Sequence, residues 1–263
     1  MAKVTGLGGV FIQAGDPKFL ARWYEDHLGI PFGTHVYTSL KWRNQNKPEE
    51  VCTTAFSMFP TPANYFLPSE KSLMINFRVE NLAELLKALE EEGITALKPM
   101  EEYDYGKFCW VMDPEGNKIE LWEPVESGFG ESAQTVPVSG AVEGLGGVFI
   151  KSKDPVALSK WYEKNFEIPF HGGNHIFKWL HQHQPAKEGS TVFAFFKEST
   201  TYFQPSEKSF MLNFIVSDLN TLLSDLKSSH VEVDPKKEDH DYGSFGWIMD
   251  PDGNKIELWQ AKG

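Results

Sequence analysis

The chain has 263 residues, of which 41% are hydrophobic and 24% charged, and this composition predicts a soluble globular protein with room for two domains. A formal net charge of −12 opposes binding to nucleic-acid phosphates or to an anionic membrane surface, so small molecules are the expected partners. Because no apolar run is long enough to span a bilayer and the first residues lack a signal-peptide core, we expect a cytoplasmic protein.

A strand and a helix are the first predicted elements. Val10-Phe11-Ile12 is a β-branched and aromatic run, and Asp16-Pro17 after it is a typical N-cap with proline at the first helical position. Apolar residues then recur at helical spacing, at Leu20, Trp23, Tyr24 and Leu28. Since Gly29 suits the left-handed conformation that closes many helices, we expect this helix to lie between Asp16 and Gly29.

Further strands and a second helix follow. Segments rich in β-branched and aromatic residues predict strands at residues 36–42, 53–59, 73–79, 108–112 and 118–122. After the third of these, a leucine stripe predicts a helix, at Leu82, Leu85, Leu86 and Leu89. The turn sequence Asp-Pro-Glu-Gly-Asn at 113–117 joins the last two strands into a hairpin. This order predicts two strand-helix-strand-strand-strand modules.

The rest of the chain repeats this pattern. Residues 6–12 return at 144–150, and residues 112–122 return at 249–259 with a single difference, Glu115 against Asp252. Such long self-similarity indicates that the repeating unit is a whole domain. The segment between the copies is rich in small and turn-forming residues without apolar periodicity. We therefore expect a first domain over 1–125, a linker over 126–142 and a second domain over 143–263.

These motifs resemble a known family. The Asp-Pro helix start, the Trp-Tyr pair, Leu28-Gly29-Ile30-Pro31 and the closing Asp-Pro-Glu-Gly-Asn-Lys-Ile-Glu-Leu-Trp are similar to motifs of the vicinal oxygen chelate superfamily. That superfamily includes glyoxalase I, the bleomycin and fosfomycin resistance proteins and the extradiol dioxygenases. The resemblance covers both halves almost end to end. It implies an α+β fold of two tandem glyoxalase-like domains, each of paired βαβββ modules whose eight strands curl into a cup that holds the ligand.

In many members of this superfamily the cup also holds a divalent metal. The resemblance implies that the glutamate of the last strand, Glu120 or Glu257, would be one ligand. The other implied positions carry glycine, methionine or phenylalanine, at Gly9, Gly147, Met74, Met211, Phe56 and Phe193. Since these residues are poor ligands for such an ion, we predict no metal site and no cofactor, with a shifted ligand set as the alternative.

Side chains alternate across a strand, so the position of Glu120 predicts which neighbours face the cup. The predicted ligand-binding residues of the first half are Phe11, Gln13, Asn76, Arg78, Trp110 and Trp122. Those of the second half are Asn213, Trp247 and Trp259. Aromatic residues around a few polar groups are typical of a small-molecule site. The alternative is that the aromatics fill the cup as a second core and that Glu120 pairs with Lys118 or Arg78.

A tyrosine stands near each expected cup. Tyr65-Phe66 precedes a Pro-Ser pair in the first half, and Tyr202-Phe203 does so in the second. These segments could form a rim whose hydroxyl groups point at a bound ligand. Ordinary loop packing explains them equally well.

Three functions are compatible with the pattern. The first is a metal-independent binding protein of the bleomycin-resistance type, with an aromatic or amphipathic small-molecule ligand. The second is a glyoxalase-like lyase or isomerase in which Glu120 and Glu257 are catalytic bases or metal ligands. The third is a non-catalytic subunit, which no specific feature supports. The fused copies also predict a monomer that imitates a homodimer of single domains.

Overall fold

The structure is a computed structural model that describes residues 4–125, 140 and 142–262. The first half contains β1 (Val4–Ala14), α1 (Pro17–Leu28), β2 (Tyr37–Asn44), β3 (Val51–Pro60), the 3-10 helix η1 (Asn64–Phe66), β4 (Leu73–Val79), α2 (Leu82–Glu91), β5 (Glu101–Tyr103), β6 (Gly106–Met112) and β7 (Lys118–Pro124). The second half contains β8 (Val142–Ser152), α3 (Pro155–Phe166), β9 (Asn174–His181), β10 (Glu188–Lys197), β11 (Phe210–Val216), α4 (Leu219–Ser228), β12 (Val233–His240), β13 (Gly243–Met249) and β14 (Lys255–Ala261).

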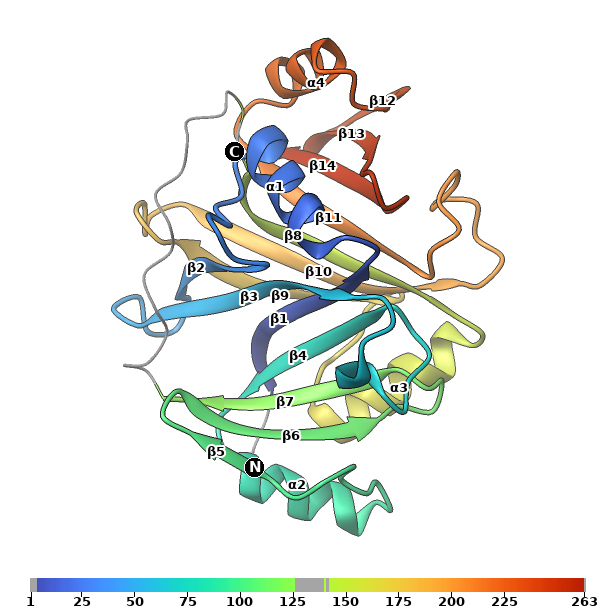
Figure 1. The fold of residues 1–263 in the computed structure, drawn as a ribbon. Helices are drawn as coiled ribbons and strands as arrows, with labels where there is room; N and C mark the ends of the chain where they lie inside the picture. Colours follow the sequence, from blue (N-terminus) through green and yellow to red (C-terminus); the bar gives the residue numbers. More distant parts are fainter. Residues whose placement is uncertain (1–3, 126–139, 141, 263) are drawn as a thin grey trace.

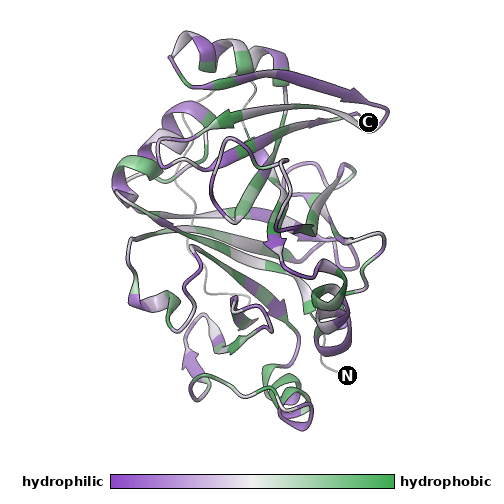
Figure 2. Ribbon diagram, turned by 90° about the vertical axis from the view of Figure 1, so that its right-hand side faces the viewer, coloured by the Kyte–Doolittle hydropathy of each residue, from purple (hydrophilic) through white to green (hydrophobic). Residues whose placement is uncertain are grey.

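The helix boundaries follow from the capping residues that the sequence indicates. Asp16 accepts hydrogen bonds from the backbone N–H groups of Lys18 and Phe19, and Gly29 takes a φ of 68° at the other end of α1. The two predicted helices of the first half and their copies are confirmed. Each helix buries one side and exposes the other, so apolar and polar residues alternate along its ribbon (Figure 2).

All fourteen described strands form one continuous sheet, in the order β12-β13-β14-β11-β8-β10-β9-β2-β3-β1-β4-β7-β6-β5 (Figure 1). The halves meet where β2 and β9 pair antiparallel, and Trp42 lies opposite His181 there. Within the first half, the antiparallel pair β1 and β4 joins the two modules. The predicted α+β architecture of strand-helix modules is therefore confirmed.

Each first module is one strand shorter than the resemblance implies. The segment after α1 contains Pro31, which lacks a backbone donor, and Gly33 at a φ of 59°, and it is irregular as far as β2. Each half thus has seven described strands instead of eight. Conversely, the sequence did not predict β5 and β12, because both are polar edge strands without apolar alternation.

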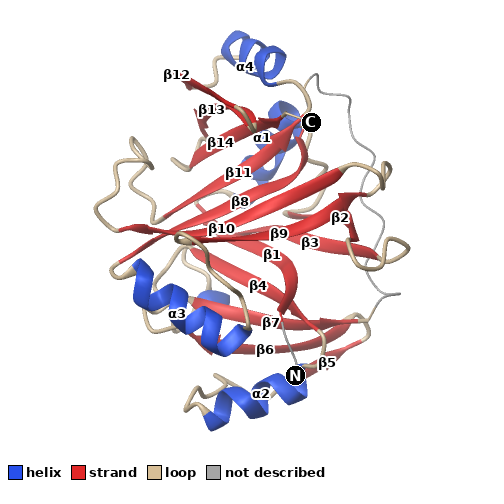
Figure 3. Ribbon diagram, turned by 180° about the vertical axis from the view of Figure 1, so that it is seen from behind, coloured by secondary structure: helices blue, strands red, loops and turns tan. Residues whose placement is uncertain are grey.

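The two halves exchange their first helices across a shared core. The ring of Tyr24 on α1 lies 6.1 Å from that of Phe214 on β11, and Tyr162 on α3 lies 6.0 Å from Phe77 on β4. Figures 1 and 3 show α1 beside the second half and α3 beside the first. One buried apolar cluster accordingly contains residues of both halves. The predicted domain limits remain a prediction, and the predicted linker over 126–142 lies outside the described residues except for Gly140 and Val142.

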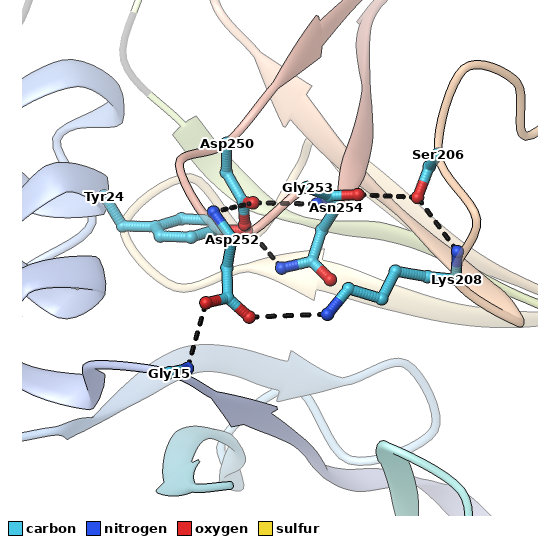
Figure 4. Close-up of polar contacts among 8 residues, drawn as sticks. All are labelled: Gly15, Tyr24, Ser206, Lys208, Asp250, Asp252, Gly253 and Asn254. Carbon is cyan, nitrogen blue, oxygen red and sulfur yellow. Dashed lines mark hydrogen bonds and ion pairs between the residues drawn. The ribbon is translucent and has the colours of Figure 1, made fainter.

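The Asp-Pro-Glu-Gly-Asn turn at 113–117 and its copy at 250–254 each contact the first helix of the opposite half. The hydroxyl of Tyr24 donates to Oδ2 of Asp250 at 2.9 Å, and the backbone N–H of Gly15 donates to Asp252 at 2.9 Å (Figure 4). Reciprocally, the hydroxyl of Tyr162 donates to Asp113 at 3.0 Å. The motif is therefore a hairpin turn and also a docking site for the opposite half.

Alternation along the strands separates this core from a second set of buried residues. Ile75, Phe77, Ile119 and Leu121 belong to the shared core. On the opposite face of the first half, Glu120 is surrounded by an apolar cluster that we call the first cup: Phe11, Phe66, Met74, Phe108, Trp110 and Trp122. The second cup surrounds Glu257 with Phe149, Ala194, Phe203, Met211 and Trp247. In the part of the chain that the structure describes, no helix is both long and apolar enough to cross a membrane.

Candidate functional site

Glu120 is the centre of the first cup and is 2% exposed. Its Oε1 accepts a hydrogen bond from Nδ2 of Asn76 at 2.6 Å. Its Oε2 accepts one from Nε1 of Trp110 at 2.7 Å and another from the hydroxyl of Tyr65. The carboxylate is thus held by three donors of the protein itself.

Strand pairing places these donors. The parallel pair β4 and β7 aligns Asn76 with Glu120, and the antiparallel pair β6 and β7 aligns Trp110 with Glu120. Tyr65 reaches the carboxylate from η1, outside the sheet. Because cross-strand neighbours share a face, the sheet fixes two of the three donors and the η1 segment adds the third.

The second cup repeats this arrangement. Glu257 is also 2% exposed, and it accepts hydrogen bonds from Asn213 at 2.6 Å, from Trp247 at 2.9 Å and from the hydroxyl of Tyr202. The same four residue types therefore meet in both halves. The predicted alternative in which Glu120 pairs with Lys118 or Arg78 is wrong, because neither side chain lies within ion-pair distance of it in the described structure. The other part of that alternative, a cup filled by aromatic side chains, agrees with the buried cluster.

Burial controls the protonation of the two glutamates. Removal from water raises the pKa of Glu120 and of Glu257, and the three hydrogen bonds to each carboxylate oppose this rise. Burial and the adjacent glutamate raise the pKa of Tyr65, which therefore stays protonated and donates. Each carboxyl is consequently a desolvated group that the protein has already supplied with hydrogen bonds.

Glycines make room for the asparagines. A Cβ atom on Gly8 would lie 2.1 Å from Oδ1 of Asn76, and one on Gly146 would lie 2.0 Å from Oδ1 of Asn213. Both Oδ1 atoms are buried without a hydrogen-bond partner among the described residues. A side chain at either glycine would push the amide away from its glutamate.

The residues present do not fit a divalent metal beside Glu120 or Glu257. Each carboxylate faces N–H and O–H donors, whose hydrogens point at the oxygens that an ion would need. At Gly9, where the resemblance implies a ligand, the ring of Phe11 lies 2.9 Å from the Cβ position. Within residues 4–125, 140 and 142–262, no three His, Cys, Asp or Glu side chains are grouped to hold an ion.

Two predicted positions near the cups are corrected. Phe56 and Phe193, which we aligned with metal ligands, belong to the shared core instead. The parallel register of β1 and β3 pairs Gly9 with Ala55, so Ala55 shares the inward face and its neighbour Phe56 points the other way. A one-residue shift moves a strand side chain to the opposite face.

Some predicted ligand-binding residues lie apart from Glu120. The amide of Gln13 holds a loop, since it donates to the carbonyl of Lys71 and accepts from the N–H of Ala63, both at 3.3 Å. The guanidinium of Arg78 lies 5.2 Å from the Trp122 ring and 5.8 Å from that of Trp42. It also forms an ion pair with Glu50 at 3.7 Å.

Arg78 and Trp259 line hollows that lie apart from Glu120 and Glu257. Arg78 borders a groove of about 640 Å³ between the halves, together with Glu50 and Lys178. Trp259 stacks on Phe245 with ring centroids 5.8 Å apart and borders a separate hollow of about 140 Å³. The structure thus brings together Phe11, Asn76, Trp110 and Trp122 with Glu120, and Asn213 and Trp247 with Glu257.

Sequence reasoning missed that the hydroxyl groups of Tyr65 and Tyr202 donate hydrogen bonds directly to the glutamates. The available signal was that a tyrosine occurs at this position in both halves.

Comparison with known proteins supports the fold. No protein-family model and no curated protein matches the sequence. Among solved structures, the Mn(II)-bound glyoxalase of Novosphingobium aromaticivorans is similar at a TM-score of 0.62 and 11% identity, over 99% of this chain and 83% of that one. The 2,3-dioxygenase LapB of Pseudomonas sp. KL28 gives a TM-score of 0.59 and 14% identity, over 99% of this chain and 93% of that one. Homoprotocatechuate 2,3-dioxygenase of Arthrobacter globiformis gives a TM-score of 0.60 and 15% identity, over 98% of this chain and 80% of that one.

These similarities extend over nearly the whole chain. Glyoxalase and the extradiol dioxygenases belong to the vicinal oxygen chelate superfamily, and this chain has their fold. At such low sequence identity, the similarity shows only that this chain shares the arrangement of strands and helices with these proteins.

Proposed function

We propose that this protein is a small-molecule binding protein of the glyoxalase and bleomycin-resistance type that works without a metal in its cups. The observation that carries the proposal is the threefold hydrogen bonding of Glu120, repeated at Glu257. A carboxylate that already accepts three hydrogen bonds from its own protein has little capacity left for an ion.

The aromatic side chains at the mouths of the cups support a role in binding. Tyr65 is 36% exposed and stacks on Phe59 with ring centroids 5.1 Å apart and planes 3° from parallel. Tyr202 stacks on Phe196 in the same way, at 5.5 Å and 3°. Flat, partly exposed ring pairs above a buried polar centre suit a planar or amphipathic ligand.

The second candidate function is a glyoxalase-like lyase or isomerase. The pKa of Glu120 and of Glu257 is raised by burial, and a carboxyl with a raised pKa suits general acid or base catalysis near neutral pH. In that function, Tyr65 or Tyr202 would have to leave its glutamate to admit a substrate proton. Exchange of a substrate proton for solvent deuterium that is lost in Glu120→Gln or Glu257→Gln would favour this second function.

Metal analysis of the purified chain tests the proposal. After incubation with Mn²⁺, Zn²⁺ or Ni²⁺ and removal of unbound ions, we expect well below one ion per chain. The Glu120→Ala and Glu257→Ala variants should then differ little from the original protein. One ion per cup that disappears in these variants would overturn the metal-free proposal.

We also infer that the chain works as a monomer that imitates a dimer of single domains. The reciprocal pairs Tyr24 with Asp250 and Tyr162 with Asp113 support this, because the two halves use the same surfaces on each other. Light scattering at moderate concentration should give one chain of 29.8 kDa per particle. A stable particle of twice that mass would contradict the inference.

A further inference from the structure

We propose that the second half holds a binding site for a small organic cation with a planar guanidinium group, against Trp259, where the first half places its own Arg78 against Trp122. This site lies apart from Glu257, so the inference goes beyond the proposed function and is tested separately from it. It is carried by a hollow, by a partly exposed indole ring and by one residue that differs between the two halves.

The first half shows which chemical group this place accepts. The guanidinium carbon of Arg78 lies 5.2 Å from the ring centroid of Trp122 and 5.8 Å from that of Trp42. An ion pair with Glu50 at 3.7 Å completes the surroundings, and Trp122 is only 2% exposed. A cation close to the face of an indole ring is attracted by the negative charge of the ring face. In the first half the chain therefore supplies the cation itself.

In the second half, Ile215 occupies the corresponding position, 137 residues after Arg78. Each of these two residues pairs with the tryptophan of the adjacent parallel strand. A Cβ atom on Gly8 would lie 3.0 Å from Cγ of Arg78, and one on Gly146 would lie 3.0 Å from Cγ1 of Ile215. The two side chains thus begin in the same way, and they differ in the guanidinium group that isoleucine lacks.

A hollow of about 140 Å³ borders both Ile215 and Trp259. A single water needs roughly 10–15 Å³, so the hollow has room for a group of several heavy atoms. Trp259 is partly exposed, whereas Trp122 is buried, and Phe245 stacks on its ring at 5.8 Å. By correspondence with the first half, the ring face that Arg78 covers there borders the hollow here. The second half thus has the indole and the space but no cation of its own over the ring.

The charges around the hollow favour a cation over an anion. Two carboxylates line it, those of Glu143 and Glu188, against the single ammonium group of Lys187. Oε2 of Glu143 accepts a hydrogen bond from Lys187 at 2.7 Å, and its Oε1 accepts none from the described residues. Burial lowers the pKa of His181, the remaining titratable group of the lining, so this ring adds no charge at neutral pH. A guanidinium ion would find both an aromatic face and an available carboxylate oxygen.

The experiment uses the full chain, labelled with ¹⁵N, and methylguanidinium as the probe. This ion is the part of an arginine side chain that Ile215 lacks, and methylurea is its uncharged counterpart of the same shape. Titration followed through the indole N–H signals should give a saturable shift of the Trp259 signal, with half-saturation on the order of 1–30 mM. Methylurea at the same concentrations should give no saturable shift.

Two exposed charges should change the affinity in opposite directions. Glu143→Gln removes the carboxylate that attracts the probe and should weaken binding about 2- to 5-fold. Lys187→Gln removes the competing ammonium group and should strengthen binding by a similar factor. Lys236→Gln makes the same change of charge at a position that does not line the hollow, and it should leave the affinity unchanged.

A further variant copies the first half into the second. Ile215→Arg combined with Lys187→Glu supplies both the guanidinium group and its carboxylate partner, and it should abolish the saturable shift. Equal shifts with methylurea, no saturation up to about 100 mM, or retained binding in the folded double variant would overturn the site. If the double variant does not fold, the opposite effects of Glu143→Gln and Lys187→Gln decide, and effects in the same direction would overturn the proposal. None of these results depends on a metal at Glu120 or Glu257, so failure here leaves the proposed function intact.

Discussion

The buried tyrosine-aspartate pairs between the halves give the most quantitative prediction. The side chain of Tyr24 is fully buried, Tyr162 is 1% exposed, and each donates to an aspartate of the other half. Tyr24→Phe and Tyr162→Phe remove one hydroxyl group and leave the rings in place, so no large cavity forms. The energetic effect is therefore that of one lost hydrogen bond to a buried carboxylate.

The magnitude follows from the partners that remain. Asp250 still accepts bonds from the backbone of Asp252 and from the backbone and side chain of Asn254, all at 2.6–2.9 Å. A hydrogen bond to a charged group contributes about 1.5–3 kcal/mol, and we expect each Tyr→Phe change to lower the free energy of unfolding by that amount. For a chain of this size, the melting temperature should fall by about 3–12 °C.

Urea denaturation of a double-mutant cycle is the appropriate assay. Tyr24→Phe, Asp250→Asn and the double variant should give a coupling energy of about 1–3 kcal/mol. Tyr24→Phe and Tyr162→Phe should be additive, because the two pairs share no residue. Tyr37→Phe, at a 56% exposed position, is the control and should have little effect. Losses below about 0.5 kcal/mol for both buried tyrosines would refute docking through these pairs.

Three further predictions concern the cups and the turns. Gly8→Ala and Gly146→Ala should each destabilise the protein by about 2–5 kcal/mol in urea denaturation, because the new methyl group displaces the asparagine from its glutamate; unchanged stability would contradict the packing. Burial raises the pKa of Glu120, Glu257, Asp113 and Asp250 in the folded state, so this state binds more protons than the unfolded chain above the ordinary carboxyl pKa. Through these four groups, stability should therefore fall as the pH rises just above the ordinary carboxyl pKa of about 4.5, and a rise there would contradict the buried positions. Glu115→Ala should cost about 1–3 kcal/mol, since Glu115 accepts bonds from Ser152, Lys153 and Asp154 before α3, whereas the exposed Glu70→Ala should be near neutral.

The sequence predicted the regular elements because their signals are local. Asp16-Pro17, Gly29 and the leucine stripe of α2 act over a few residues, and they mark helices that the structure contains. Strand alternation predicted that Met74 and Trp122 face the cup while Ile75 and Leu121 face the core, and this is confirmed.

Contacts between distant segments could not be predicted in the same way. Tyr65 and Glu120 are 55 residues apart, and nothing in either local sequence indicates that the hydroxyl donates to the carboxylate. The exchange of α1 and α3 depends on the relative placement of the halves, which the repeat itself does not determine. Phe56 was assigned to the wrong face because alignment with a family position does not establish strand parity.

An anomalous difference map from crystals grown with Mn²⁺ tests the central claim most directly, because it locates metal ions independently of the protein atoms. We predict no anomalous peak within coordination distance of Glu120 or Glu257, and density for the hydroxyl groups of Tyr65 and Tyr202 at their carboxylates. An anomalous peak bound to either glutamate, with the tyrosine displaced, would contradict the account.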